Sequence, residues 1–325
     1  MNFKKLSPLI PVVMLPLGLF LGWRAFRDHS PSEIAAAVEQ IPAGHLALAV
    51  LFTAASYLCL TGFDALALRY VGRRLPYPRI ALTSFVSLSI GHNVGVAALS
   101  SGTLRYRFYS ESGLSAAEVG KIILFCGVTV GLGLTMLGGI ALLLRPGFAG
   151  GVLGLGPGLA RLAGGGLLLL CALYVALCWR VRRPLRIRGH AVGLPGPRLA
   201  AAQLLLGTVN FACVAAVLHQ LLAGALAYPE TIAVYVLSSA AAFLTHVPGG
   251  LGVIEYVVAS LVPQGNVVGA LIGLRIVYFF LPLLLGGALL AVAEIRRWRC
   301  GMAEGGVERG EVEACPAPSP AARRA

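Results

Sequence analysis

The sequence predicts an all-α fold, a polytopic membrane helical bundle. Hydrophobic residues make up 58% of the 325 residues, charged residues only 12%, and the mean hydropathy is +0.83. Soluble domains carry about 25% charged residues, so this composition excludes an ordinary soluble protein. A helix that crosses a hydrocarbon core of roughly 30 Å needs about 20 apolar residues. Windows near that length lie at 6–23, 46–68, 80–99, 121–144, 162–179, 199–222, 232–247 and 267–293.

Basic residues between these windows predict their orientation. Lysine and arginine number 26 against 13 acidic residues, and they cluster beside the apolar windows. Lysine and arginine near span ends stay in the cytoplasm, so Lys4 and Lys5 place the N-terminus inside. Arg296, Arg297 and Arg299 place the chain after the last window on the same side. Both termini are therefore expected to be cytoplasmic.

Eight ordinary crossings conflict with this charge rule. If 80–99 crossed the membrane, the densest basic link, 180–198, would lie outside. The conflict disappears if 80–99 is a re-entrant hairpin, and its small and polar residues favour this: Thr83, Ser84, Ser87, Ser89, Gly91, His92, Asn93 and Gly95. The range 232–262 then also dips in and returns. About six full spans plus two re-entrant broken-helix hairpins are predicted, with eight ordinary spans as the alternative.

This arrangement has the form of an inverted repeat, with halves 1–145 and 162–295. Each half reads span, span, hairpin, span, and the halves have opposite orientation. A shared spacing gives the repeat weak support, because His92 precedes a lysine by 29 residues and His246 precedes Arg275 by 29. Inverted repeats with broken helices near the bilayer midplane recur in transporters.

The two halves form one predicted integral membrane domain, residues 1–295. No link between the apolar windows is long enough to hold a folded soluble domain. Residues 296–325 are rich in Gly, Pro, Ala and charge, a composition that predicts a disordered cytoplasmic tail.

The most specific motif is 245–255, Thr-His-Val-Pro-Gly-Gly-Leu-Gly-Val-Ile-Glu. In a helix, glycine costs about 1 kcal/mol and proline about 3 relative to alanine, so one helix is expected to end before Pro248 and another to start beyond the glycines. Helix N-termini attract anions. The N–H groups of Gly249, Gly250 and Gly252 are therefore predicted to face an anion near the midplane.

Glu255 follows the glycines and is the only acidic residue between Glu230 and Glu294. An ionisable residue at membrane depth indicates a functional site by default. Glu255 is therefore predicted to offset either a cationic headgroup or Arg275, and His246 is added to the candidate substrate site. The alternative is a structural kink in which Glu255 simply pairs with Arg275.

The first hairpin supplies the other candidate substrate residues. His92 and Asn93 lie in it, and Arg105 and Arg107 follow it. Arginine suits bidentate phosphate contacts, so these two residues predict a lipid phosphate site at the inner mouth, with Tyr109 at the headgroup level. The alternative is that the glycines of this hairpin form a helix-packing face and the arginines are cytoplasmic anchors.

Catalysis, by contrast, has little support in the sequence. The histidines have no metal-ligand spacing, and no nucleophile, Walker or dinucleotide motif occurs. No catalytic residue, metal or cofactor is predicted. The alternative is an intramembrane enzyme acting on lipid or polyprenyl phosphate, with His92 or His246 as general base and Glu255 as its orienting partner.

Segments 91–109 and 246–255 resemble the membrane region of the lysylphosphatidylglycerol synthases, and the stand-alone bacterial inner-membrane relatives still more. The resemblance covers roughly residues 1–300. In the bifunctional members, the membrane region is a flippase that moves aminoacylated phosphatidylglycerol outward, and a C-terminal cytoplasmic domain transfers the amino acid from tRNA. Only about thirty residues follow the last window here, so the transferase domain is expected to be absent.

The resemblance implies a bacterial inner-membrane lipid flippase or lipid-binding transporter without transferase activity. The expected partner is an anionic phospholipid, with or without an attached amino acid, and no nucleic acid is expected. A further alternative is a membrane scaffold for a separately encoded lipid-modifying enzyme.

Overall fold

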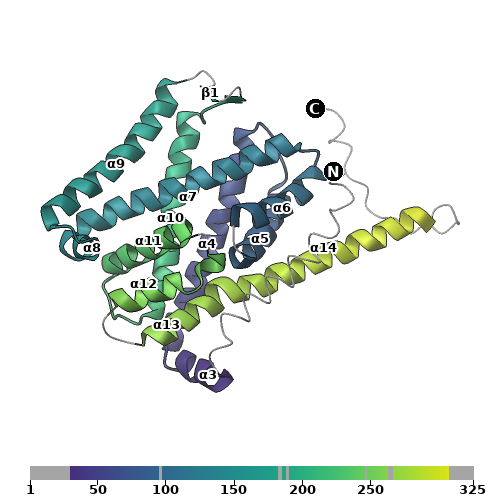
Figure 1. Ribbon diagram of the computed structural model, residues 1–325. Coiled ribbons are helices and arrows are strands. Elements are labelled where there is room, and N and C mark those ends of the chain that lie inside the picture. Colours follow the sequence, from purple (N-terminus) through teal and green to yellow (C-terminus); the bar gives the residue numbers. More distant parts are fainter. Residues whose placement is uncertain are drawn as a thin grey trace.

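The computed structural model describes residues 30–94, 97–181, 185–187, 190–245, 247–262 and 266–306, which form a bundle of helices (Figure 1). Strands β1 (Leu185–Ile187) and β2 (His190–Val192) form a small antiparallel hairpin between two of the helices. The helices are α3 (Pro31–Glu39), α4 (Ala43–Tyr70), α5 (Tyr77–Val94), α6 (Ala97–Ser110), α7 (Ala116–Leu144), α8 (Pro146–Val152), α9 (Pro157–Arg180), α10 (Pro197–Leu221), α11 (Tyr228–Thr245), α12 (Val253–Leu261), α13 (Val267–Leu274) and α14 (Leu281–Gly306). The predicted helical membrane fold is confirmed.

Within the described residues, five helical stretches are long and apolar enough to cross a membrane. They are α4, α7, α9, α10 and the continuous stretch Val267–Ile295 through α13 and α14. Each coincides with a predicted full span. The remaining predicted span, 6–23, lies outside the described residues. Many large apolar side chains on these helices are exposed, as expected for surfaces that face lipid.

The two predicted hairpins are the places where the structure breaks an apolar stretch into paired helices. Helix α5 ends at Val94 and packs along α6, which begins at Ala97, and α11 packs along α12 after the break that contains Pro248–Gly250. The turn at Pro248–Gly250 also contacts α5, so the two broken elements meet inside the bundle.

The first helix pair is longer than predicted. Its return limb, α6, runs to Ser110, whereas the predicted hairpin ended at residue 99. Arg105 and Arg107 therefore lie on a packed helix and not in a loop at the membrane surface. A lipid phosphate at the inner mouth was predicted for these arginines, with cytoplasmic anchoring as the alternative, but both side chains have acidic partners inside the bundle.

The elements divide between the two predicted halves as follows, and the repeat itself stays a prediction. After α4, the first half continues with the α5–α6 pair and α7, and the second half has α9, α10, the α11–α12 pair and α13–α14. The opposite orientation of the halves stays a prediction. Helices α3 and α8 and the β1–β2 hairpin were not predicted.

The predicted tail begins too early. Helix α14 continues to Gly306, whereas the tail was expected from residue 296. Alanine, arginine, glutamate and methionine in this stretch favour a helix, and they extend α14 beyond its apolar part. Residues 307–325 lie outside the described part of the chain.

Glycines allow the closest helix contacts. A Cβ added at Gly133 on α7 would lie 2.5 Å from the carbonyl carbon of Gly207 on α10, and one at Gly207 would lie 2.6 Å from the carbonyl oxygen of Thr129. At the first hairpin, a Cβ at Gly91 would lie 2.8 Å from that of Ser101. Gly91 therefore contributes to a packing face, one of the alternatives drawn from the sequence.

We expect Gly207→Ala to destabilise the protein by about 1 to 3 kcal/mol, because its methyl group would overlap the backbone of α7. Gly131→Ala is the matched control, since nothing lies within 4 Å of its added Cβ. The control should be neutral or slightly stabilising. Thermal melting of both variants in the same detergent measures the difference. Equal melting temperatures for the two variants would contradict the backbone contact.

Candidate functional site

The turn between α11 and α12 has a backbone that only glycine adopts easily. Gly249, Gly250 and Gly252 have φ values of 60°, 61° and 79°, all in the left-handed region. In this conformation the carbonyl oxygens of Gly249 and Gly250 accept hydrogen bonds from the Arg275 guanidinium, at 2.5 and 3.2 Å. The break in the helix therefore presents backbone acceptors that one buried cation satisfies.

Arg275 also forms the ion pair that the sequence raised as an alternative. Its Nε donates to Glu255 Oε1 at 2.6 Å. The guanidinium also lies 4.7 Å from the ring centroid of Phe279, a cation–π contact. The Arg275 side chain is 7% exposed and that of Glu255 is 32% exposed. The carboxylate is therefore the member of the pair that faces outward.

The glycine N–H groups are not arranged as predicted. The N–H of Gly250 donates to the carbonyl of Val247 at 3.0 Å, and that of Gly252 donates to Glu255 Oε2 at 2.9 Å. Glu255 thereby caps the N-terminus of α12 from inside the same chain. The prediction that these two amides face an anion from a ligand is corrected, because a turn hydrogen bond satisfies Gly250 and the Glu255 cap satisfies Gly252.

Arg105 and Tyr109, predicted at the inner mouth and headgroup level, instead join a buried cluster with Asp64 of α4. Nε and Nη2 of Arg105 donate to the two Asp64 carboxylate oxygens at 2.9 and 2.8 Å, and the Tyr109 hydroxyl donates to Oδ1 at 3.1 Å. The Arg105 and Asp64 side chains are 4% and 0% exposed. The sequence analysis missed Asp64, although an acidic residue within a predicted span is itself a signal.

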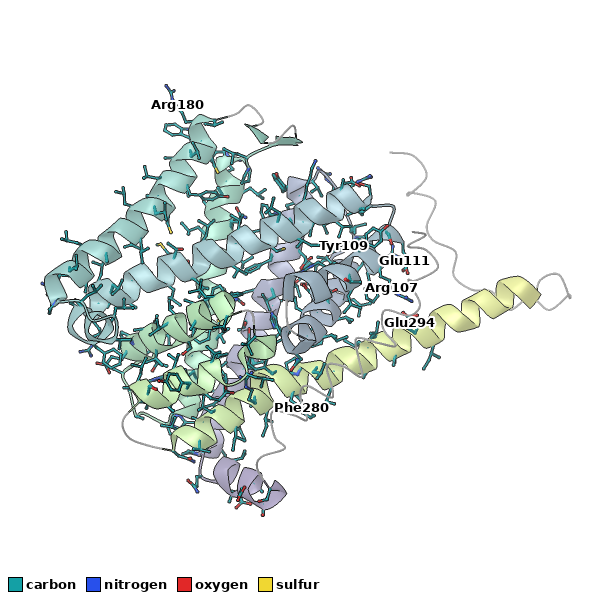
Figure 2. The ribbon with its side chains drawn as sticks, in the orientation of Figure 1. Arg107, Tyr109, Glu111, Arg180, Phe280 and Glu294 are labelled. Atoms are coloured by element: carbon teal, nitrogen blue, oxygen red, sulfur yellow. The ribbon has the colours of Figure 1, made fainter. Side chains whose placement is uncertain are left out.

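Arg107 is likewise held inside the bundle. Its Nη2 lies 2.6 Å from both carboxylate oxygens of Glu294 on α14, and Figure 2 shows the two side chains where α6 and α14 approach each other. The arginine side chain is buried and the glutamate is partly exposed. Arg107 therefore ties the first hairpin to the last span.

The first hairpin also supports the segment that carries Arg275. Residues Arg275–Phe280 form a π-helix, a form found often at functional sites. Two donors from other elements reach its carbonyl groups: Asn93 Nδ2 donates to Phe279 at 3.2 Å, and the Tyr57 hydroxyl donates to Tyr278 at 3.4 Å. Asn93 therefore contacts the π-helical segment, whereas the sequence predicted a contact with substrate.

His92 lies at the same junction. Its ring stacks on Tyr278, with centroids 6.3 Å apart, and meets the edge of Tyr57 at 6.2 Å. Its Nδ1 is buried and has no hydrogen-bond partner among the described residues. The enzyme alternative requires a carboxylate that orients the histidine, and no described carboxylate contacts that nitrogen. His246, the other candidate base, lies outside the described residues.

We expect Asp64→Ala to cost about 3 to 5 kcal/mol, because the buried Arg105 guanidinium loses its carboxylate partner. Arg73→Gln is the control; its pair with Glu118 is exposed, so little change is expected. The double variant D64L/R105M should recover most of the loss because neither charge remains. Thermal melting in detergent measures the stability of each of these variants. A double variant no more stable than Asp64→Ala would contradict the assignment of this loss to an unpaired charge.

No family model matches this chain. The chain is 31% identical over 266 residues to the uncharacterized protein slr0712 of Synechocystis sp. (strain ATCC 27184 / PCC 6803 / Kazusa), across 80% of this chain and 82% of that protein. It is 30% identical over 275 residues to the inner membrane protein YbhN of Escherichia coli (strain K12), across 81% and 80% of the two chains. This protein therefore belongs to the family that contains YbhN and slr0712, and it is a multi-pass helical membrane protein.

Proposed function

We propose that this protein binds an anionic phospholipid beside the junction of its two hairpins and moves it across the bacterial inner membrane. The observation that carries the proposal is the Arg275–Glu255 pair at the glycine turn of a broken helix. Irregular backbone at membrane depth is tolerated only where protein buries it or where it lines a polar cavity. Ionisable residues at that depth mark substrate pathways in transporters.

The geometry of the pair suggests how a headgroup is received. Glu255 is the exposed member, so a headgroup reaches the carboxylate before it reaches the guanidinium. Displacement of Glu255 makes Arg275 available to a phosphate, which arginine binds with paired hydrogen bonds. An amino group on the headgroup then has Glu255 as its partner. In this scheme, an aminoacylated phospholipid satisfies both members of the opened pair.

The resemblance to the flippase region of the lysylphosphatidylglycerol synthases supports the same proposal, because its second motif includes the glycine turn and Glu255. A separately encoded lipid-modifying enzyme would supply the modified lipid. We propose transport rather than intramembrane catalysis, since the contacts described for His92 include none with a carboxylate.

Transport measurements test the roles of the pair. In proteoliposomes with fluorescent phosphatidylglycerol, Glu255→Gln and Arg275→Gln should lower the rate of movement between leaflets by about tenfold or more, the effect of losing about 1.4 kcal/mol of stabilisation at the slow step. Arg145→Gln, at an exposed pair with Glu230, is the control. All variants are compared at equal amounts of folded protein. Wild-type rates in both site variants would remove the pair from the proposal, and no movement by the wild-type protein would remove the transport function.

The proposed orientation has both termini in the cytoplasm, which places the α6–α7 link inside and the α8–α9 link outside. In a cysteine-free background, an impermeant thiol reagent should label Ser110→Cys only from the cytoplasmic side. Leu153→Cys should be labelled only from the other side. Both residues are exposed, so neither reaction requires unfolding. Labelling of residue 110 from the periplasm would overturn this orientation.

A further inference from the structure

His92 lies where the two hairpins touch, and its surroundings are unusual for a structural histidine. Its carbonyl oxygen would lie 3.4 Å from a Cβ added at Gly249, so the end of α5 contacts the glycine turn directly. The imidazole lies against two tyrosine rings, and its Nδ1 is buried without a hydrogen-bond partner. A buried polar atom without a partner costs free energy, typically about 1 to 3 kcal/mol, and requires an explanation.

The charges around His92 are already balanced in pairs. Among the side chains that the structure describes on the elements packed against α5, the charged or titratable ones are His45, Tyr57, Cys59, Asp64, Arg69 and Tyr70 on α4, Arg105, Tyr106, Arg107 and Tyr109 on α6, Arg275 and Tyr278 in the π-helical segment, and Glu294 on α14; the turn Pro248–Gly250 contributes none. Asp64 pairs with Arg105, Glu294 with Arg107, and Glu255 with Arg275. A proton on His92 therefore adds an uncompensated positive charge at the junction, close to the cation of Arg105.

We propose that His92 is a proton-binding site that couples proton movement to opening of the hairpin junction. The coupling follows from the free-energy cost of an unpaired charge at this junction, because removing such a charge from water costs several kcal/mol. The protonated imidazole is stable only where water or a carboxylate reaches it. Protonation therefore favours a state in which α5 separates from the glycine turn, and by linkage, opening favours protonation. This inference rests on the proposed transport function and supplies its energy source, a proton gradient.

A titration that needs no transport tests the proton site itself. The full-length protein, labelled with ¹⁵N-histidine and placed in nanodiscs, is compared with His92→Asn by NMR. The signal missing from the variant should titrate between roughly pH 4 and 8, the range in which histidine environments move its protonation. Reactivity of a cysteine at the exposed Leu244, near the turn, should change with the same midpoint in the wild-type background and not with His92→Asn. A His92 signal that does not titrate overturns the inference.

The coupling is tested in proteoliposomes with fluorescent phosphatidylglycerol. The wild-type rate should respond to an imposed pH gradient, by up to about tenfold per pH unit for one required proton. His92→Asn should lose this response to the gradient, whatever rate it retains. His45→Asn is the matched control, because Nδ1 of His45 is also buried without a partner but lies at the start of α4, beside His219.

The outcomes separate the inference from the function on which it rests. Lipid movement that ignores the gradient in the wild-type protein, or a gradient response that His92→Asn retains, overturns the coupling and leaves the transport proposal standing. No lipid movement in the wild-type protein removes the transport proposal. The NMR titration and the cysteine reactivity then decide alone whether His92 is a proton site that opens the junction.

Discussion

The contacts of Arg275 are the constraint on which the hairpin junction depends. A helix that breaks inside an apolar bundle leaves carbonyl groups without partners, and no water in the hydrocarbon region replaces them. Arg275 supplies donors to two of these carbonyls and to Glu255, while Glu255 caps the helix that follows. One side chain thus holds the two ends of the break together. In turn, the π-helical segment that begins at Arg275 is held by donors from α4 and α5.

Arg105 and Arg107, also buried within the described part of the chain, likewise pair with a carboxylate from another helix. Arg105 joins α6 to α4, and Arg107 joins α6 to α14, each through a carboxylate on a helix distant in sequence. Each pair is neutral overall, so the bundle contains ionic groups without a net buried charge at these positions. Removing one member leaves a charge with no water to solvate it, whereas removing both leaves an apolar contact. The ion pairs therefore join helices that are distant in sequence.

Spans and breaks were predictable from the sequence because both are local properties. A run of apolar residues sets the length of α7 or α10, and Pro248 with its glycines ends α11 whatever lies nearby. The Glu255–Arg275 pairing could be raised from the sequence because Glu255 is the only acid in that stretch. The partner of Arg105 was not predictable in this way, since Asp64 lies 41 residues away and the contact exists only in the folded bundle. Two glycine amides were misassigned because each already has a nearby partner in the chain: Glu255 for Gly252 and the carbonyl of Val247 for Gly250.

The contact between Gly133 and Gly207 has a mechanical consequence. At this crossing point backbone lies against backbone, so no side chain separates α7 from α10 there. These two spans come from different halves of the chain, so their close contact fixes the two halves to each other at this point. If the proposed opening at the glycine turn occurs, this close contact favours movement of the α5–α6 and α11–α12 pairs relative to α7 and α10, and not movement between α7 and α10.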